Sequence, residues 1–394
     1  MRGVRPARFK PLRAIGTAAA VAAGLIALPL MLEARLAKPE QAVDDKWKRL
    51  PIRRRGHTLL GISFRPRQVE AFGLDKKATL GALLAYPFDL IRLAAYWNHI
   101  EVRPGEFDTS ELDWQLEAAE RAGKRVILSV GAIKNFGYPE FFVPEHWLQP
   151  PLREGSLVRP ATHAALLSGA RQFVRQIVER YRDRRLVVAW QLEHEAVDPL
   201  GIEHSWRLGM DFVQGELEAL RDADPSRPVM MNGFLPTSSV VRLSQWWRTR
   251  DQGDSLAVAS QVADIVGIDY YPRHALVALG PRTLYLDGGG LPWQRALTTD
   301  FLEVVRKQGK RVMVSEGQSE PWEAVTLPPN PRQRAMFSCR PEDAIRNYNS
   351  AMEWSHRESP TYAYLFWGAE YWVLRDQSGD PGYLQAFARV LDEA

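Results

Sequence analysis

The chain has 394 residues, of which 45% are hydrophobic and 25% are charged, the composition of an ordinary globular protein. The formal net charge is +4, but residues 1–13 hold five basic side chains and no acidic one, so the remainder carries a net charge of −1. A nearly neutral body argues against nucleic acid as a partner. With a single cysteine, Cys339, the chain has no internal disulfide, and its eight histidines form no H-x-H or H-E-x-x-H pair. We therefore expect neither a metal nor another cofactor.

The basic start, residues 1–13, is followed by an uncharged run over residues 14–32. This run is close to the roughly 20 residues that cross a bilayer as a helix. Its basic flank is expected to stay in the cytoplasm as a short tail, with everything downstream outside. The sequence thus predicts an uncleaved anchor, because Leu32-Glu33-Ala34 is a poor signal-peptidase site. Cleavage of the run as a signal peptide would instead give a secreted protein. Residues 33–56, charged and without periodicity, are expected to be a linker.

From residue 57 to residue 394 the chain alternates short β-rich runs with amphipathic stretches. Helical spacing occurs at 112–122, 161–181, 205–221, 301–308, 344–357 and 383–391. The expected strands are 58–64, 89–96, 125–130, 187–195, 228–232, 264–271, 311–318 and 362–367. Eight alternating units predict an α/β fold, a (β/α)₈ TIM barrel, in one domain. A doubly wound sheet is disfavoured because no G-x-G-x-x-G follows the first strand.

Long connections rich in proline and glycine follow three of these strands. They span Asn135–Pro160, Pro272–Pro292 and Gly317–Pro341. In a barrel the segments between a strand and the next helix lie on the catalytic face. Long loops in compact domains are usually functional or disordered. We therefore expect these three loops around the active site.

Two of the expected strands end in carboxylates. The run Val187–Glu195 ends in Glu193 and Glu195, and Arg311–Gln318 contains Glu316 near its end. An ionised carboxylate is costly to bury, so such strand ends should meet at the barrel's wet rim. Strand alternation would place Gln191, Glu193 and Glu195 on one face, although Glu193 fits a structural ion pair equally well. Two facing carboxylates, Glu195 and Glu316, are the minimum for cleaving a glycosidic bond.

Four segments together carry a family resemblance. Tyr96–Phe107, Trp190–Glu195, Val314–Trp322 and Phe366–Trp372 resemble segments of the clan A retaining glycoside hydrolases, most nearly bacterial family 5 and family 42-like members. The similarity covers roughly residues 58–375. It implies that Glu195 is the acid/base and Glu316 the nucleophile, acting on a carbohydrate.

The resemblance also implies the residues that bind the sugar. Arg92 and Tyr271 should lie beside Glu316 and stabilise its charge, and Trp367 should form the floor of the sugar subsite. Trp97 and Trp322, within the matching segments, are further expected substrate contacts. The sequence departs from the family at His194, which occupies the position of an asparagine that holds the sugar 2-hydroxyl.

These features predict a retaining β-glycoside hydrolase in the bacterial inner membrane, single-pass, with its barrel in the periplasm. His194 keeps open an alternative, a catalytically impaired barrel that binds envelope polysaccharide. Transglycosylation by the same two carboxylates is a third possibility.

Overall fold

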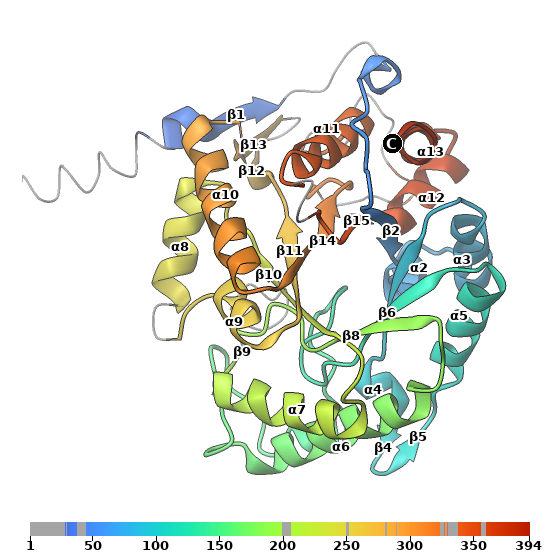
Figure 1. Cartoon of the computed structure of the whole chain (residues 1–394), viewed down its shortest axis with the longest axis vertical. Coiled ribbons are helices and arrows are strands. Elements are labelled where there is room, and N and C mark those ends of the chain that lie inside the picture. Colours follow the sequence, from blue (N-terminus) through green and yellow to red (C-terminus); the bar gives the residue numbers. More distant parts are fainter. Residues whose placement is uncertain are drawn as a thin grey trace, which may run out of the picture.

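The structure is a computed structural model that describes residues 28, 30–37, 45–198, 206–249, 252–279, 282–288, 290–323, 327, 329, 338–355 and 360–394. Eight parallel strands close into a barrel in the order β10–β11–β14–β15–β2–β3–β6–β8 (Figure 1). Their bounds are β2 (Leu59–Ser63), β3 (Leu90–Ala94), β6 (Arg125–Ser129), β8 (Val187–Gln191), β10 (Val229–Phe234), β11 (Ile265–Tyr270), β14 (Arg311–Gln318) and β15 (Ala363–Trp367). Each of the eight predicted strands is present in the predicted order, and the (β/α)₈ barrel is confirmed.

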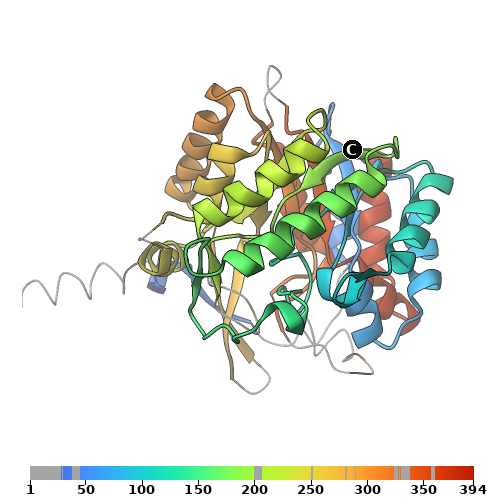
Figure 2. The ribbon, with the colours of Figure 1, turned by 90° about the horizontal axis from the view of Figure 1, so that it is seen from below.

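Helices surround the barrel on its outside (Figures 1 and 2). They are α2 (Pro66–Ala71), α3 (Lys76–Leu84), α4 (Trp97–Ile100), α5 (Ser110–Arg121), α6 (Ala164–Tyr181), α7 (Met210–Ala223), α8 (Ser239–Thr249), α9 (Ser255–Val262), α10 (Pro292–Lys307), α11 (Pro341–Met352), α12 (Ala369–Gln377) and α13 (Gly382–Glu393). In α6, residues such as Ala170, Phe173, Val174 and Ile177 recur at helical spacing and are buried. The apolar stripe thus faces the barrel, as predicted. Helix α7 begins later than predicted because β9 (Arg207–Leu208) pairs with β7 (Leu157–Val158).

The barrel interior changes from apolar to polar toward the carboxyl ends of its strands. The apolar layer consists of Leu90, Ile127, Ala189, Met230, Ile265, Met313, Ala363 and Leu365. Two residues further along five of these strands lie Arg92, Ser129, Gln191, Asn232 and Ser315, all buried. Because strand side chains alternate, each of these points into the barrel like its apolar predecessor. Buried polar groups are costly unless they are hydrogen-bonded. Arg92, Gln191, Asn232 and Ser315 belong to a hydrogen-bonded network that holds the candidate site, whereas the Ser129 hydroxyl has no partner in it.

The loops that follow the barrel strands have the predicted location. Asn135–Pro160 contains the 3₁₀ helix η2 (Glu145–Trp147) and β7. Pro272–Pro292 contains an antiparallel hairpin of β12 (Arg273–Leu279) and β13 (Arg282–Asp287). Residues 324–326, 328, 330–337 of the third loop are outside the described residues.

The segment expected to be a linker contains regular structure. Strand β1 (Ala34–Ala37) pairs antiparallel with β13, and η1 (Lys46–Arg49) buries Trp47 against the core. Part of 33–56 is thus packed on the barrel. The expected cytoplasmic tail 1–13 and most of the expected anchor lie outside the described residues; of residues 14–32, only 28 and 30–32 are described, and they are helical. Within the described part of the chain, no helix is both long and apolar enough to cross a bilayer.

Candidate active site

A β-bulge in β14 turns two consecutive side chains into the barrel. Ile268 pairs with Val314, but the next residue of β11, Asp269, pairs with Glu316, so Ser315 is the extra residue. The register between β14 and β15 shifts at the same place. Bulges redirect side chains and are frequent beside active sites. Here Ser315 and Glu316 both face the barrel centre, and the Ser315 Oγ donates to Asp269 Oδ1 at 2.7 Å.

Glu316 is held by two donors on its two oxygens. Arg92 donates from Nη2 to Oε1 at 2.5 Å, and the Tyr271 hydroxyl donates to Oε2 at 2.5 Å. The Arg92 guanidinium is itself fixed by Ser63 Oγ, 2.9 Å from its Nε, and by Gln191, 3.4 Å from its Nη1. All of these side chains are buried. A cation and a hydroxyl in this arrangement stabilise the ionised carboxylate. The structure therefore brings together three predicted site residues, Glu316, Arg92 and Tyr271.

The chain after β8 does not continue as an extended strand. Glu193 and Glu195 have φ values of +48° and +44°. Such left-handed conformations are uncommon for residues other than glycine and cluster at functional sites. The prediction that Gln191, Glu193 and Glu195 share one face of a strand is therefore wrong, because alternation ends at Gln191.

The Glu193 carboxylate binds backbone amides of a neighbouring loop. Its two oxygens accept hydrogen bonds from the amides of Ile133, at 2.9 Å, and Lys134, at 2.6 Å. Burial, followed by the charge of Glu193, raises the pKa of the buried Glu216 on α7 well above its ordinary value. Glu193 thus connects the loop after β6 to the loop after β8, which favours a structural role, although its hydrogen bonds come from backbone amides and not from the expected ion-pair partner.

His194 belongs to a chain of hydrogen bonds across three strands. Gln191 Nε2 donates to Asn232 Oδ1 at 3.0 Å, and Asn232 Nδ2 contacts His194 Nδ1 at 2.8 Å and donates to Asp269 Oδ2 at 2.5 Å. Burial, followed by the charges of Arg92 and Lys134, lowers the pKa of His194 well below its ordinary value. The imidazole is therefore neutral, with Nδ1 as acceptor and the proton on Nε2.

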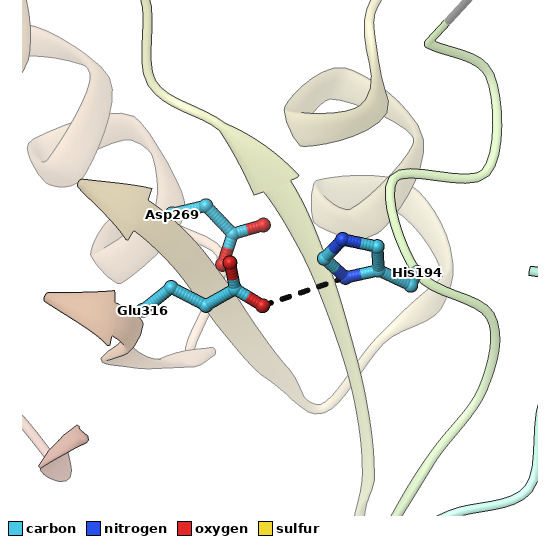
Figure 3. A group of neighbouring side chains, drawn as sticks. All are labelled: His194, Asp269 and Glu316. Carbon is cyan, nitrogen blue, oxygen red and sulfur yellow. Dashed lines mark ion pairs between the residues drawn. The ribbon is translucent and has the colours of Figure 1, made fainter. Parts of the chain in front are cut away.

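Asp269 interacts electrostatically with both predicted catalytic residues. Figure 3 shows its carboxylate beside that of Glu316, with His194 facing both, and His194 Nδ1 is 3.7 Å from Glu316 Oε1. Burial and then the charge of Glu316 raise the pKa of Asp269 well above its ordinary value.

Glu195 has the surroundings of a protonated acid. Burial, and next the charge of Asp269, raise its pKa well above the ordinary value, and Asp198 and Glu140 add smaller contributions. Lys134 holds the backbone of residues 195–198 in place, because its Nζ donates to the carbonyls of Glu195, at 2.7 Å, and Asp198, at 2.9 Å. Glu195 and Glu316 thus differ in environment: Glu316 accepts from a guanidinium and a hydroxyl, whereas burial and the charge of Asp269 favour the protonated form of Glu195.

Aromatic side chains border this polar centre. Tyr96, Phe136, Phe142, Phe234, Tyr271 and Trp367 form one cluster of buried rings. The Arg65 guanidinium lies 4.2 Å from the Trp367 ring centre, and Arg92 lies 4.0 Å from that of Phe136. Trp322 is 47% exposed, and its ring centre is 4.9 Å from that of Tyr271. Trp322, against Tyr271, and Trp367, whose ring centre lies 5.5 Å from the Arg92 guanidinium, thus adjoin the two residues that hold Glu316.

Trp97 is elsewhere. Its side chain is fully buried, it stacks on Phe173 with ring centres 5.5 Å apart, and its Nε1 donates to Glu101 at 2.6 Å. This position argues against the predicted substrate contact. Trp97 is the first residue of α4, and its ring packs in the outer core against Phe173 of α6.

One group of side chains has the spacing of metal ligands. Atoms of His194, Asp269 and Glu316 lie within 4.8 Å of one another. Each carboxylate oxygen of the two acids, however, already accepts a hydrogen bond, from Arg92, Tyr271, Ser315 or Asn232. The positive charge of Arg92 would also repel a metal cation bound between these side chains. The donor set therefore fits a hydrogen-bonded carboxylate network better than a metal centre.

The sequence analysis missed several residues of this site. They are Asp269, Asn232, Ser315, Lys134 and Glu140. Asp269 ends a β-rich run with a carboxylate, so the reasoning that identified Glu195 and Glu316 could have found it. Glu140 is half-buried; burial raises its pKa to about 7 and the charge of Glu316 contributes. Nothing local marked Glu140, since it lies within a long loop.

Comparisons with solved structures show the same fold in two glycoside hydrolase families. A novel GH10 endoxylanase retrieved from a sugarcane soil metagenome aligns with a TM-score of 0.52 at 16% identity, over 86% of this chain and 98% of its own. GH5_18 from Streptomyces cattleya, in complex with GlcNAc, aligns with a TM-score of 0.51 at 14% identity, over 80% of this chain and 71% of its own.

A third similar structure is the exo-beta-1,4-mannosidase Op5Man5 from Opitutaceae bacterium strain TAV5. It aligns at 18% identity over 81% of this chain with a TM-score of 0.48, and this chain spans only 55% of its length. No family model and no curated protein sequence matches the chain. At the level of fold, the chain therefore shares the (β/α)₈ barrel of the GH5 and GH10 glycoside hydrolases, as the sequence resemblance predicted.

Proposed function

We propose that the chain is a retaining β-glycoside hydrolase that acts on a poly- or oligosaccharide. One observation carries the proposal: two buried carboxyl groups at the carboxyl end of the barrel have opposite surroundings. Glu316 accepts from Arg92 and Tyr271, whereas burial and the charge of Asp269 favour the protonated form of Glu195. A pair of carboxyls whose environments separate their protonation states is the arrangement that glycoside hydrolysis requires.

In the first step the ionised Glu316 attacks the anomeric carbon. The bond from that carbon to the leaving oxygen breaks, and the proton of Glu195 passes to that oxygen. The product is a glycosyl ester of Glu316. Arg92 and Tyr271 orient the Glu316 carboxylate for the attack, and the bulge at Ser315 turns the Glu316 side chain into the barrel.

In the second step Glu195, now ionised, takes a proton from water. The water oxygen bonds to the anomeric carbon and the ester bond breaks, which restores both carboxyl groups. Asp269 favours the return of the proton to Glu195, because two adjacent carboxylates resist simultaneous ionisation. An acceptor sugar in place of water would give transglycosylation with the same residues.

His194 is able to replace the family's asparagine in this scheme. Because Asn232 occupies Nδ1, the neutral ring presents Nε2–H as a donor, which is what an asparagine amide would offer to a sugar 2-hydroxyl. This supports a functional barrel over the impaired one.

Hydrolysis of a panel of aryl β-glycosides tests the proposal, with the anomer of the first product followed by NMR. We expect release of the β-anomer and no turnover by Glu316→Gln. A wild-type protein that binds polysaccharide but cleaves no member of the panel, and none of a polysaccharide panel in a reducing-end assay, would favour the impaired barrel. An α-anomer as first product would exclude the retaining mechanism.

We also propose that residues 14–32 anchor the protein in the bacterial inner membrane with the barrel in the periplasm. The uncharged run and its basic flank support this. Carbonate washing of membranes with N-terminal sequencing tests it. Soluble protein that begins near residue 35 would show cleavage instead.

A further inference from the structure

Large apolar side chains are exposed where the N-terminal segment meets the barrel. Leu30, Met31 and Leu32 precede β1, Trp246 and Trp247 lie on α8, and Trp293 lies at the start of α10. We call these six residues the apolar patch. The two tryptophans of α8 are 58% and 60% exposed, and Met31 is 77% exposed. The three segments that carry them adjoin, because Glu33 contacts Ser239 at the start of α8 and Gln294 on α10. Exposed apolar groups on adjoining elements indicate an interaction surface.

Glu33 fixes the N-terminal segment beside this patch. Its buried carboxylate accepts from Ser238 Oγ at 2.6 Å, from the backbone amide of Ser239 at 2.9 Å, and from Gln294 Nε2 at 2.9 Å. Ser239 begins α8, so the carboxylate also meets the positive end of that helix. Gln294 is the neighbour of Trp293 on α10. Four residues of β1 then pair with β13 (Figure 1). The segment is thus bound to the barrel directly after Leu32.

This binding determines where a membrane would lie. Glu33 is the first charged residue after the uncharged run 14–32, and it is attached to α8 and α10. If the run enters a bilayer, no free tether separates the bilayer from these two helices. The patch is rich in tryptophan, the residue that is enriched at membrane interfaces because it pairs an apolar ring with a polar N–H. A lipid surface is therefore the occupant that the geometry favours over a second protein.

We propose that the apolar patch rests on the bilayer into which residues 14–32 insert, so that the barrel has a fixed orientation with α8 against the lipid. The proposal rests on the proposed anchor and not on the hydrolase activity. Ser238 and the β12–β13 hairpin follow β10 and β11 at the catalytic end of the barrel. The rim of the candidate site would then lie close to the membrane surface.

Site-specific probes on the full chain test this orientation. Cys339 is buried, so a cysteine introduced at an exposed position is labelled selectively, with the wild-type protein as the blank. The test variant is Trp246→Cys. The matched control is Val102→Cys on β4 (Glu101–Arg103), which is 69% exposed and lies far from β1 and α8 in Figure 1. Each is labelled with bimane and reconstituted in vesicles of phosphatidylcholine and phosphatidylglycerol, with or without a nitroxide-labelled phospholipid.

We expect the nitroxide lipid to quench the probe at position 246 several times more strongly than the probe at position 102, and soluble iodide to show the reverse order. Equal quenching at both positions by both agents would overturn the proposal. So would a probe at 246 that neither agent reaches, since a protein would then cover the patch. If the full chain does not float with the vesicles, residues 14–32 do not anchor it, and the proposed orientation is overturned as well. None of these readouts depends on glycoside hydrolysis.

Discussion

Replacing Asp269 by asparagine removes one negative charge beside Glu195 while keeping the shape of the side chain. An asparagine presents one oxygen and one NH₂ group, so it can accept from Ser315 Oγ or from Asn232 Nδ2 but not from both, as Asp269 does at 2.7 Å and 2.5 Å. In either orientation of the new amide, one buried donor loses its acceptor. We expect the free energy of unfolding to fall by about 1–3 kcal/mol, the usual cost of a buried unsatisfied polar group.

The effect on catalysis is separate from this loss of stability. The charge of Asp269 contributes to the raised pKa of Glu195, so its removal should lower that pKa. The acid form of Glu195 is then lost at a lower pH, and the basic limb of the kcat/KM profile moves to lower pH. Beyond that limb the rate falls about tenfold for each further pH unit.

The assay is kcat/KM against pH for Asp269→Asn and the wild type, together with urea unfolding of both. Ser315→Ala is the matched control, because it removes a donor to Asp269 and leaves the charge. We expect this control to lower stability by a comparable amount without moving the basic limb to lower pH. An unshifted or upward-shifted basic limb in Asp269→Asn, in a folded protein, would refute the role of Asp269.

Three further outcomes are expected. Glu316→Gln should abolish turnover of every glycoside, measured by aryl release, because an amide does not attack the anomeric carbon; residual turnover on any substrate above background would contradict its role. Glu195→Gln should slow substrates with poor leaving groups by about 10²- to 10⁴-fold, the usual contribution of general acid–base catalysis. A dinitrophenyl glycoside needs no proton to depart, so azide should restore its turnover as a β-azide product, and an effect that is equal for all leaving groups would transfer the role to Glu140. The free energy of unfolding should fall as the pH rises from about 5 to 8. Burial raises the pKa of Asp198 from its ordinary value of 3.8 to about 6, and that of Glu140 from 4.5 to about 7. In this pH range the folded state therefore keeps protons that the unfolded state has already released. Urea titrations at the two pH values measure this, and Asp198→Asn should reduce the difference.

The sequence alone predicted the barrel, which the structure confirms, and identified Glu195 and Glu316 as the candidate catalytic carboxylates. Barrel strands are short β-rich runs, and the helices between them show apolar residues at helical spacing, so both signals are local. Glu195 and Glu316 were identified because each lies near the end of a predicted strand. Burying an ionised carboxylate in the core costs free energy, so such a residue is expected at the solvent-accessible rim of the barrel. The same argument would have included Asp269.

Only the tertiary structure decided where individual side chains point. Whether Glu316 faces Arg92 depends on the bulge at Ser315, which is a property of the register between three strands. Glu193 turns to the amides of the neighbouring loop because its φ is positive, whereas a regular strand would have placed it with Glu195. Trp97, which matched a family segment, is buried in the outer core. Register and left-handed φ values are fixed by contacts between residues far apart in the chain, and no local pattern encodes them.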